Sequence, residues 1–240
     1  IESIVGIQFG IFSPEEIEQR AVVEITTQNT YEGNEPKIGG LFDPRMGVLE
    51  NGKLCRSCGH TNHNCPGHFG FYRLARPVYF IQFLPEVLRI LRCVCIRCSK
   101  LLINKENNRD ILRRRGQVRW AEVIKRCANV KLCGEDHEDG CGAPQPEKYL
   151  REGGIAKISA VFAENQTMPL EVEYVQRLFK RITDEDVDFM GFNHHWCRPD
   201  WMICSVLPVA PPQVRPSVLQ DNNKRSEDDL THKYFEIIKT

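Results

Sequence analysis

The stretch Cys55-Arg-Ser-Cys-Gly-His-Thr-Asn-His-Asn-Cys-Pro-Gly-His68 contains two pairs of potential metal ligands, and two residues separate the members of each pair. Structural zinc takes four Cys or His ligands in a tetrahedron, and ligands spaced in this way fit around a tight knuckle of backbone. Gly59, Pro66 and Gly67 are residues that favour turns. The sequence therefore predicts one closed zinc site made by Cys55, Cys58, Cys65 and His68.

Two further histidines, His60 and His63, lie between the two pairs and compete for the fourth ligand position. Their spacing from the cysteines does not complete a second knuckle, whereas the spacing of His68 does. We therefore expect His60 and His63 to be residues of a surface loop.

A second group of cysteines starts with Cys95-Ile-Arg-Cys98, and its partners must lie further along the chain. Glycine follows both Cys133 and Cys141, as a knuckle turn requires, whereas Cys127 lies in the helical pattern of 120–130. The pattern favours Cys95, Cys98, Cys133 and Cys141 as a second zinc site. Two alternatives remain open: Cys93 or Cys127 is a ligand, or this group consists of reduced thiols without metal.

The number and spacing of the cysteines favour metal over disulfides. The chain has 11 cysteines, an odd number, and most of them form close pairs. We find no leader peptide and no apolar run long enough to span a membrane, so we expect a reducing compartment. Each predicted site has four protein ligands and no open position, which is typical of structural zinc. We expect Cys197 and Cys204 to be buried thiols.

Local patterns predict an α+β chain of irregular architecture, stabilised by zinc, with several helices and short strands. Ser13, Pro14 and Glu16 form the signature of a capped helix start. Helical periodicity covers 77–93, where Pro85 marks a kink or a break between two helices, and also 171–182 and 229–239. Residues 4–12 and 153–163 alternate as strands do. The proline-rich run 206–216 is expected to be extended and rigid, and 220–229 to be a mobile polar loop.

Charge is distributed unevenly along the chain. The net charge is zero, but 89–126 contains twelve Lys or Arg and three acidic residues, an excess of nine. A basic segment of this size could neutralise nucleic-acid phosphates, and Arg113, Arg114 and Arg115 are its densest part. The alternative is a solvated basic surface that contacts another subunit or nothing.

No catalytic motif is visible in the sequence. It has no GxxxxGK[ST], GxSxG or HExxH string, and no group of spaced aspartates of the kind that binds catalytic magnesium. Because the chain starts at Ile1 and stops at Thr240 within a helical pattern, we expect it to be a piece of a longer protein.

Several strings, in this order, resemble the N-terminal clamp region of the largest subunit of multisubunit DNA-directed RNA polymerases. They span nearly the whole chain and are Gln8-Phe-Gly-Ile-Phe-Ser-Pro-Glu-Glu-Ile17, Gly40-Leu-Phe-Asp-Pro-Arg-Met-Gly47, Cys65-Pro-Gly-His-Phe-Gly70, Gly140-Cys-Gly-Ala-Pro-Gln-Pro146, Arg198-Pro-Asp-Trp-Met-Ile203 and Glu227-Asp-Asp-Leu-Thr-His-Lys233. The strings are most similar to the eukaryotic RNA polymerase II class and its relatives in large DNA viruses.

The resemblance implies part of a nucleotidyltransferase complex whose clamp closes over DNA and the RNA–DNA hybrid. It supports the same eight ligands for two structural zinc ions, and it places the catalytic aspartates and their magnesium beyond residue 240. It implies four segments: the N-terminal strand, helix and loop (1–50), a zinc-binding clamp head (51–145), a clamp core (146–219), and a lid-like loop with the start of a helix (220–240). Expected partners are the second-largest subunit, other polymerase subunits, template DNA and the hybrid, with no membrane.

Three departures from the family pattern leave a viral or divergent origin open: the short segment between Cys98 and Cys133, the residue Cys197, and the unusual string Asn193-His-His-Trp196. The expected location is the nucleus for a cellular protein, and the virion or the viral replication compartment in the host cytoplasm for a viral one. The alternative function is a stand-alone zinc-binding interaction module of the RING type. A RING interleaves its two ligand sets, whereas here the first set closes at His68 before the second begins at Cys95. A zinc enzyme would need an open coordination position and an adjacent acid or base, and the sequence shows neither.

Overall fold

The computed structural model describes the chain except residues 1–2, 136–137, 153–156 and 220–224. Its contacts divide the chain into two compact units, residues 1–12 with 76–204 and residues 13–75 with 205–240. Strand β3 (Gly70–Tyr79) pairs with β7 (Ile203–Val209), and the boundary between the units falls inside both strands. Six α-helices and several short strands among the described residues make the fold α+β, as expected.

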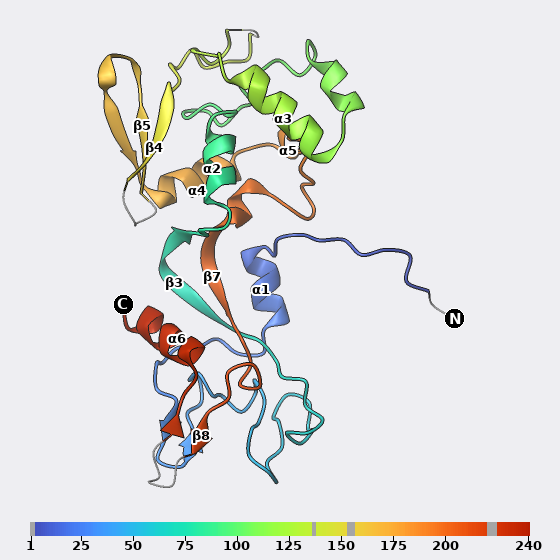
Figure 1. The fold of residues 1–240 in the computed structure, drawn as a ribbon, viewed down its shortest axis with the longest axis vertical. Helices are drawn as coiled ribbons and strands as arrows, with labels where there is room; N and C mark the ends of the chain where they lie inside the picture. Colours follow the sequence, from blue (N-terminus) through green and yellow to red (C-terminus); the bar gives the residue numbers. More distant parts are fainter. Residues whose placement is uncertain (1–2, 136–137, 153–156, 220–224) are drawn as a thin grey trace. The chain divides into compact units, whose positions relative to one another are not determined.

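The first unit contains four α-helices and a small antiparallel sheet. The helices are α2 (Leu84–Leu91), α3 (Gly116–Cys127), α4 (Val172–Lys180) and α5 (Asp184–Met190). Strand β5 (Lys157–Val161) pairs with β4 (Lys148–Glu152) and with β6 (Thr167–Leu170) (Figure 1). Short 3-10 turns lie at Arg109–Arg113 (η1), Ala163–Asn165 (η2) and Pro199–Met202 (η3).

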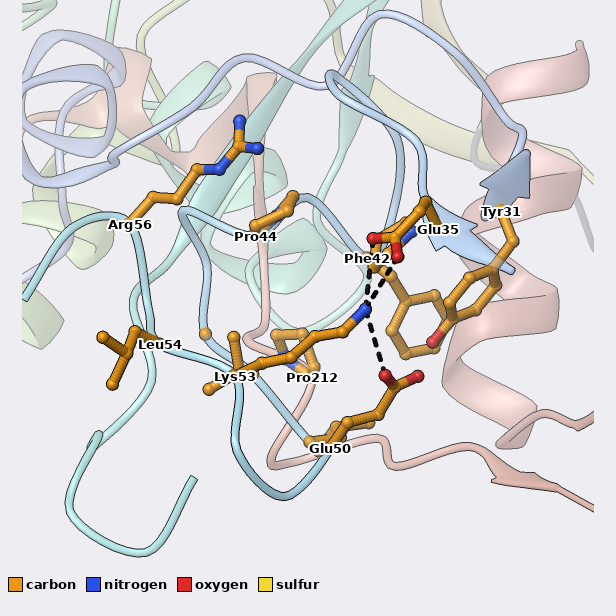
Figure 2. A pocket seen from close by; sticks show the side chains of 13 residues that line it. Tyr31, Glu35, Phe42, Pro44, Glu50, Lys53, Leu54, Arg56 and Pro212 are labelled. Carbon is orange, nitrogen blue, oxygen red and sulfur yellow. Dashed lines mark hydrogen bonds and ion pairs between the residues drawn. The ribbon is translucent and has the colours of Figure 1, made fainter. Parts of the chain in front are cut away.

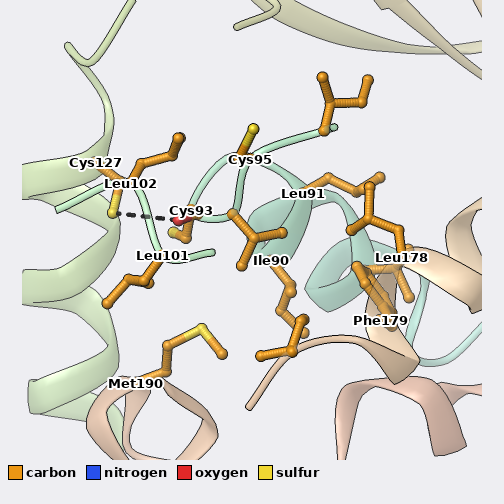
Figure 3. Close-up of a cluster of buried hydrophobic side chains, with 14 of the residues drawn as sticks. Ile90, Leu91, Cys93, Cys95, Leu101, Leu102, Cys127, Leu178, Phe179 and Met190 are labelled. Carbon is orange, nitrogen blue, oxygen red and sulfur yellow. Dashed lines mark hydrogen bonds between the residues drawn. The ribbon is translucent and has the colours of Figure 1, made fainter. Parts of the chain in front are cut away.

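One apolar core joins the helices of this unit. Ile90 and Leu91 of α2 pack with Leu178 and Phe179 of α4, and Met190 of α5 belongs to the same cluster (Figure 3). All five side chains are buried because the apolar residues of each helix recur on one face. The second group of cysteines follows α2 directly, so this core fixes the position of its first knuckle.

The second unit contains α1 (Pro14–Arg20), α6 (Asp229–Lys239) and two short hairpins. The hairpins are β1–β2 (Tyr31–Glu32 with Glu35–Pro36) and β8–β9 (Val218–Leu219 with Arg225–Ser226). Most of the remaining chain is loop, and its core is small, with Val23, Ile25, Leu41, Phe42, Met46 and Val209. A loop-rich unit with so few apolar residues is the kind that a bound metal stabilises.

Three local expectations were wrong. Residues 3–12 form no regular secondary structure, and Ile4, Ile7 and Phe9 are 91%, 81% and 91% exposed, because a strand needs a partner for its backbone groups. The helix expected over 77–93 begins only at Leu84, since β-branched and aromatic residues at 78–80 favour strand pairing instead. The run 206–216 is extended only to Val209 and then turns at its prolines.

The other local expectations and the division into segments have different outcomes. The helix over 171–182 is confirmed as α4, and that over 229–239 as α6. Half of the mobile loop expected over 220–229 falls outside the described residues, and in the other half Arg225 and Ser226 form β9 and Asp229 begins α6. The contact-based units do not follow the four sequential segments 1–50, 51–145, 146–219 and 220–240, and that assignment stays a prediction.

Candidate metal centres

The first group of four potential ligands, Cys55, Cys58, Cys65 and His68, comes together in the second unit. Their ligand atoms all lie within 4.8 Å of one another, and Sγ of Cys65 is 3.7 Å from Nε2 of His68. Zinc–sulfur and zinc–nitrogen bonds of about 2.3 and 2.0 Å place tetrahedral ligands roughly 3.5–3.8 Å apart. The separation therefore fits a shared tetrahedral zinc ion.

Backbone turns hold this first group in place. The N–H of Gly59 donates to the carbonyl of Cys55 at 2.8 Å, and the N–H of Cys65 donates to the carbonyl of Thr61 at 2.9 Å. Gly59 and Gly67 have φ values of +70° and +82°, a region that glycine enters without steric cost. The glycines singled out in the sequence thus form the two knuckles.

Thiol chemistry in the first group also suits a metal. Hydrogen bonds from the backbone N–H of His60 and from the side chain of His68 to the Cys58 sulfur lower the pKa of this thiol to about 6. Burial raises the pKa of Cys65 to about 11. Zinc binds the thiolate form of cysteine. The Cys58 sulfur is already mostly thiolate at neutral pH, whereas the metal must displace the proton of Cys65. His60 and His63 are exposed and lie outside the group of four.

The second group, Cys95, Cys98, Cys133 and Cys141, comes together in the first unit. Sγ of Cys95 is 3.6 Å from Sγ of Cys141, and Sγ of Cys98 is 3.7 Å from Sγ of Cys133. All four sulfurs lie within 4.8 Å of one another. These distances match the edges of a tetrahedral zinc–thiolate site, and they are far longer than a disulfide bond.

Two hairpin-like knuckles bring these distant cysteines together. The N–H of Cys95 donates to the carbonyl of Lys100, and the N–H of Cys133 donates to the carbonyl of Ala143. Isolated bridges between Val94 and Leu101, and between Leu132 and Pro144, close the two knuckles. Each group thus fits one structural zinc ion, with four protein ligands and no position left for a substrate.

The competing cysteines lie elsewhere. Cys93 and Cys127 are buried, and Sγ of Cys127 donates to the carbonyl oxygen of Cys93 at 3.9 Å (Figure 3). Cys204 is buried and Cys197 is half-buried, and both lie outside the two groups. The two groups are sequential and not interleaved, which is the opposite of the RING arrangement.

Sequence reasoning missed one residue at the second centre, Gln145. This side chain is 8% exposed, and its Nε2 lies 3.3 Å from Sγ of Cys95. Its Oε1 accepts a hydrogen bond from the N–H of Ile96 at 3.1 Å. No spacing rule marks a glutamine fifty positions from the cysteine that it contacts, so only the structure identifies it.

The basic segment is partly neutralised within the chain. Arg114 pairs with Glu122 at 2.5 Å, and Arg126 pairs with both Glu122 and Asp110. Arg113 and Arg115 are exposed, and no ion pair to either is found in the part of the chain that the structure describes. Two of the three arginines singled out by the sequence therefore present unpaired charge.

A chain that holds two closed four-ligand metal groups in a loop-rich α+β fold is a metal-stabilised structural module. The sequence model for RNA polymerase Rpb1, domain 1, matches residues 1–240, and the chain belongs to this family. It is 39% identical over 250 residues to the DNA-directed RNA polymerase II subunit RPB1 of Euplotoides octocarinatus, an alignment that covers 97% of this chain and 52% of the relative. The chain thus spans about half the length of that curated relative.

No helix in the described part of the chain is both long and apolar enough to cross a membrane.

Proposed function

We propose that this chain is the N-terminal clamp part of the largest subunit of a DNA-directed RNA polymerase. In this role it closes over DNA and the RNA–DNA hybrid during transcription. The observation that carries the proposal is the family match across residues 1–240, together with two ligand groups that each fit a structural zinc ion.

Zinc holds the shape of the chain and does no chemistry in this proposal. Cys55, Cys58, Cys65 and His68 bind one ion, and Cys95, Cys98, Cys133 and Cys141 bind the other. The first ion organises loops that have a small apolar core, and the second joins the knuckle after α2 to the one at 133–141. A clamp has to transmit force without deforming, and four-ligand metal sites stiffen irregular backbone.

Nucleotidyl transfer would belong to the assembled enzyme. Its magnesium would be held by residues outside this chain, and its partners would include the second-largest subunit. We infer a nuclear location because the relative is an RNA polymerase II subunit. A viral location stays a prediction. The segments 51–145 and 146–219 would serve as clamp head and core, and the region at 220–229 as the lid-like loop.

Nucleic acid would contact the basic segment at Arg113 and Arg115, and to a lesser degree at Arg114, which is paired with Glu122. These side chains are exposed, and neighbouring acidic groups already neutralise Arg126 and Arg114. The support is the unpaired charge that remains at positions 113 and 115.

Metal analysis by mass spectrometry on the purified chain tests the zinc part of the proposal. Native protein should carry two zinc ions, and Cys65→Ser and Cys133→Ser should each carry one. Cys127→Ser is the matched control, because Cys127 is a buried cysteine outside both groups, and it should keep both ions. Loss of both ions from a single substitution would overturn the assignment of two independent sites.

The clamp role requires the assembled polymerase. Complexes that carry Cys65→Ser in the full-length subunit should dissociate from DNA faster than the native enzyme when challenged with salt. Equal lifetimes, with zinc confirmed as missing from the first site, would contradict the clamp proposal.

A further inference from the structure

The side chain of Gln213 fills a slot between two glycines in different loops. A Cβ atom placed on Gly47 would lie 2.4 Å from Nε2 of Gln213, and one placed on Gly67 would lie 2.8 Å from its Oε1. The same Cβ on Gly67 would also lie 2.8 Å from Cβ of Pro211. A side chain at Gly67 would therefore displace Pro211 and the segment around it, and one at Gly47 would displace the amide of Gln213.

One wall of this slot is the first metal centre itself. Gly67 lies between the ligands Cys65 and His68, and the N–H of His68 donates to the carbonyl of Met46 at 2.8 Å. The second wall, Gly47, follows Met46 directly. A metal ion that fixes the Cys65–His68 knuckle therefore fixes both walls of the slot.

Close packing, and not hydrogen bonding, holds the side chain of Gln213 in this slot. Neither amide atom of the Gln213 side chain has a hydrogen-bond partner among the described residues, although both atoms are buried. Pro212, the residue before it, lines a pocket with Pro44 and Gly47 (Figure 2). Close packing on both sides, without directional bonds, makes the segment sensitive to the spacing of the walls.

Gln213 belongs to a turn that leads into the β8–β9 hairpin. The N–H of Val214 donates to the carbonyl of Pro211 at 3.0 Å, and the N–H of Arg215 donates to that of Pro212 at 3.1 Å. Strand β8 begins at Val218, three residues after Arg215. The far strand is anchored too, because Arg225 donates to Oε1 of Glu50 at 2.9 Å.

We propose that metal in the first centre positions the turn Pro211–Arg215, and through it the β8–β9 hairpin, with Gln213 as the positioning residue. When the metal leaves, the Cys65–His68 knuckle loosens, the slot widens and the turn loses its support. The proposal rests on the zinc occupancy proposed above for Cys55, Cys58, Cys65 and His68. It makes the positions of the turn and of the paired strands β8 and β9 depend on the metal.

Amide hydrogen exchange at Val214 and Arg215 tests the contact, after zinc content has been measured. At equal zinc content, Gly67→Ala should speed exchange at these two amides at least tenfold relative to Gly59→Ala, because both changes strain a knuckle at positive φ but only a Cβ at residue 67 displaces Pro211 and Gln213. Gly59→Ala is the matched control: Gly59 lies in the other knuckle with φ of +70°, and a Cβ there meets no atom within 4 Å. Equal exchange in the two variants would overturn the proposal.

The coupling must also act in reverse, because two linked equilibria affect each other equally. Gln213→Ala should weaken the affinity of the first centre for zinc severalfold in a competitive titration with a chelator, whereas Gln213→Met, which keeps the bulk of the side chain, should not. The zinc affinity of the second centre should be unchanged in both. An unchanged affinity of the first centre in Gln213→Ala would refute this proposal alone, while native protein without zinc in the first centre would refute the proposed function as well.

Discussion

The side-chain amide of Gln145 donates a hydrogen bond to Sγ of Cys95 over 3.3 Å, and the carbonyl oxygen of the same amide accepts one from the N–H of Ile96 over 3.1 Å. The amide nitrogen also donates to the carbonyl of Ala143 at 2.9 Å. One side chain therefore joins the two knuckles of the second centre. A donor to a metal-bound sulfur orients the thiolate and stabilises its negative charge.

Gln145→Ala should weaken zinc binding at the second centre about 10–100-fold, the usual effect of losing a partner that orients a ligand. A competitive titration with a coloured chelator measures this affinity for each centre. Gln117→Ala is the control, since Gln117 is exposed on α3, and it should leave both affinities unchanged. An unaltered second centre in Gln145→Ala would show that the sulfur needs no such support.

Local signals were the part of the fold that the sequence could predict. The capping box between Ser13 and Glu16 is present with both hydrogen bonds, and the helices expected over 171–182 and 229–239 form as α4 and α6. Such features depend on residues three or four apart. Residues 77–79 could not be placed this way, because they belong to β3, whose partner strand β7 begins more than 120 positions later in the chain.

The metal centres show the same difference between local sequence signals and long-range contacts. The first group lies within one short stretch, so its spacing indicated all four residues. The second needs two knuckles brought together by the core around α2 and α4, and the glycines after Cys133 and Cys141 favoured the pair that lies beside Cys95 and Cys98 in the structure. The hydrogen bond from Gln145 to Cys95 is a tertiary contact, and the spacing of residues along the chain does not indicate it.

Asp43→Asn should destabilise the second unit by about 2–3 kcal/mol, the scale of lost hydrogen bonds to a buried charge. The Asp43 side chain is fully buried, and it accepts hydrogen bonds from the N–H of Gly39 at 2.6 Å and from the Arg45 guanidinium at 2.7 Å. An asparagine would set its NH₂ against one of these donors. Denaturant unfolding followed by circular dichroism measures the loss.

The effect of Asp43 should depend on pH. Burial alone would raise the pKa of this carboxyl, but hydrogen bonds from Arg45 and Gly39 outweigh burial and hold the pKa below the ordinary value of 3.8. The folded state thus binds this proton less readily than the unfolded state, so the contribution is complete above about pH 4 and is lost as the pH falls through the folded pKa. The difference between native protein and Asp43→Asn should shrink below that pH. Glu32→Gln, in an exposed pair with Lys37, should change stability by under about 1 kcal/mol at any pH.

Arg215→Lys should destabilise the second unit by about 2–4 kcal/mol, because a lysine cannot serve three separated acceptors as a planar guanidinium does. Arg215 is fully buried and donates to the carbonyls of Ala210 and Leu41 and to the hydroxyl of Thr231. Burial lowers the pKa of Arg215 to about 10, so the side chain is still charged at neutral pH. The midpoint of denaturant unfolding measures the change. The exposed Arg56, changed to Lys, should leave that midpoint within experimental error, and a similar shift in both variants would contradict a specific role for Arg215.

Reversal of charge at Arg113 and Arg115 should weaken DNA retention by the assembled polymerase and flatten its dependence on salt. Each phosphate contact contributes about one unit to the slope of log affinity against log salt, so loss of two contacts should lower the slope by about two. Arg114 is left unchanged, because its ion pair with Glu122 would turn into a repulsion and disturb α3.

The control is the double variant Lys148→Glu with Arg151→Glu, which alters the same number of charges at exposed positions of β4. A lower slope in the Arg113 and Arg115 variant alone would assign this loop to nucleic acid. Equal slopes in the two double variants would mean that only net charge matters, and the basic segment would then be a solvated surface or a protein contact.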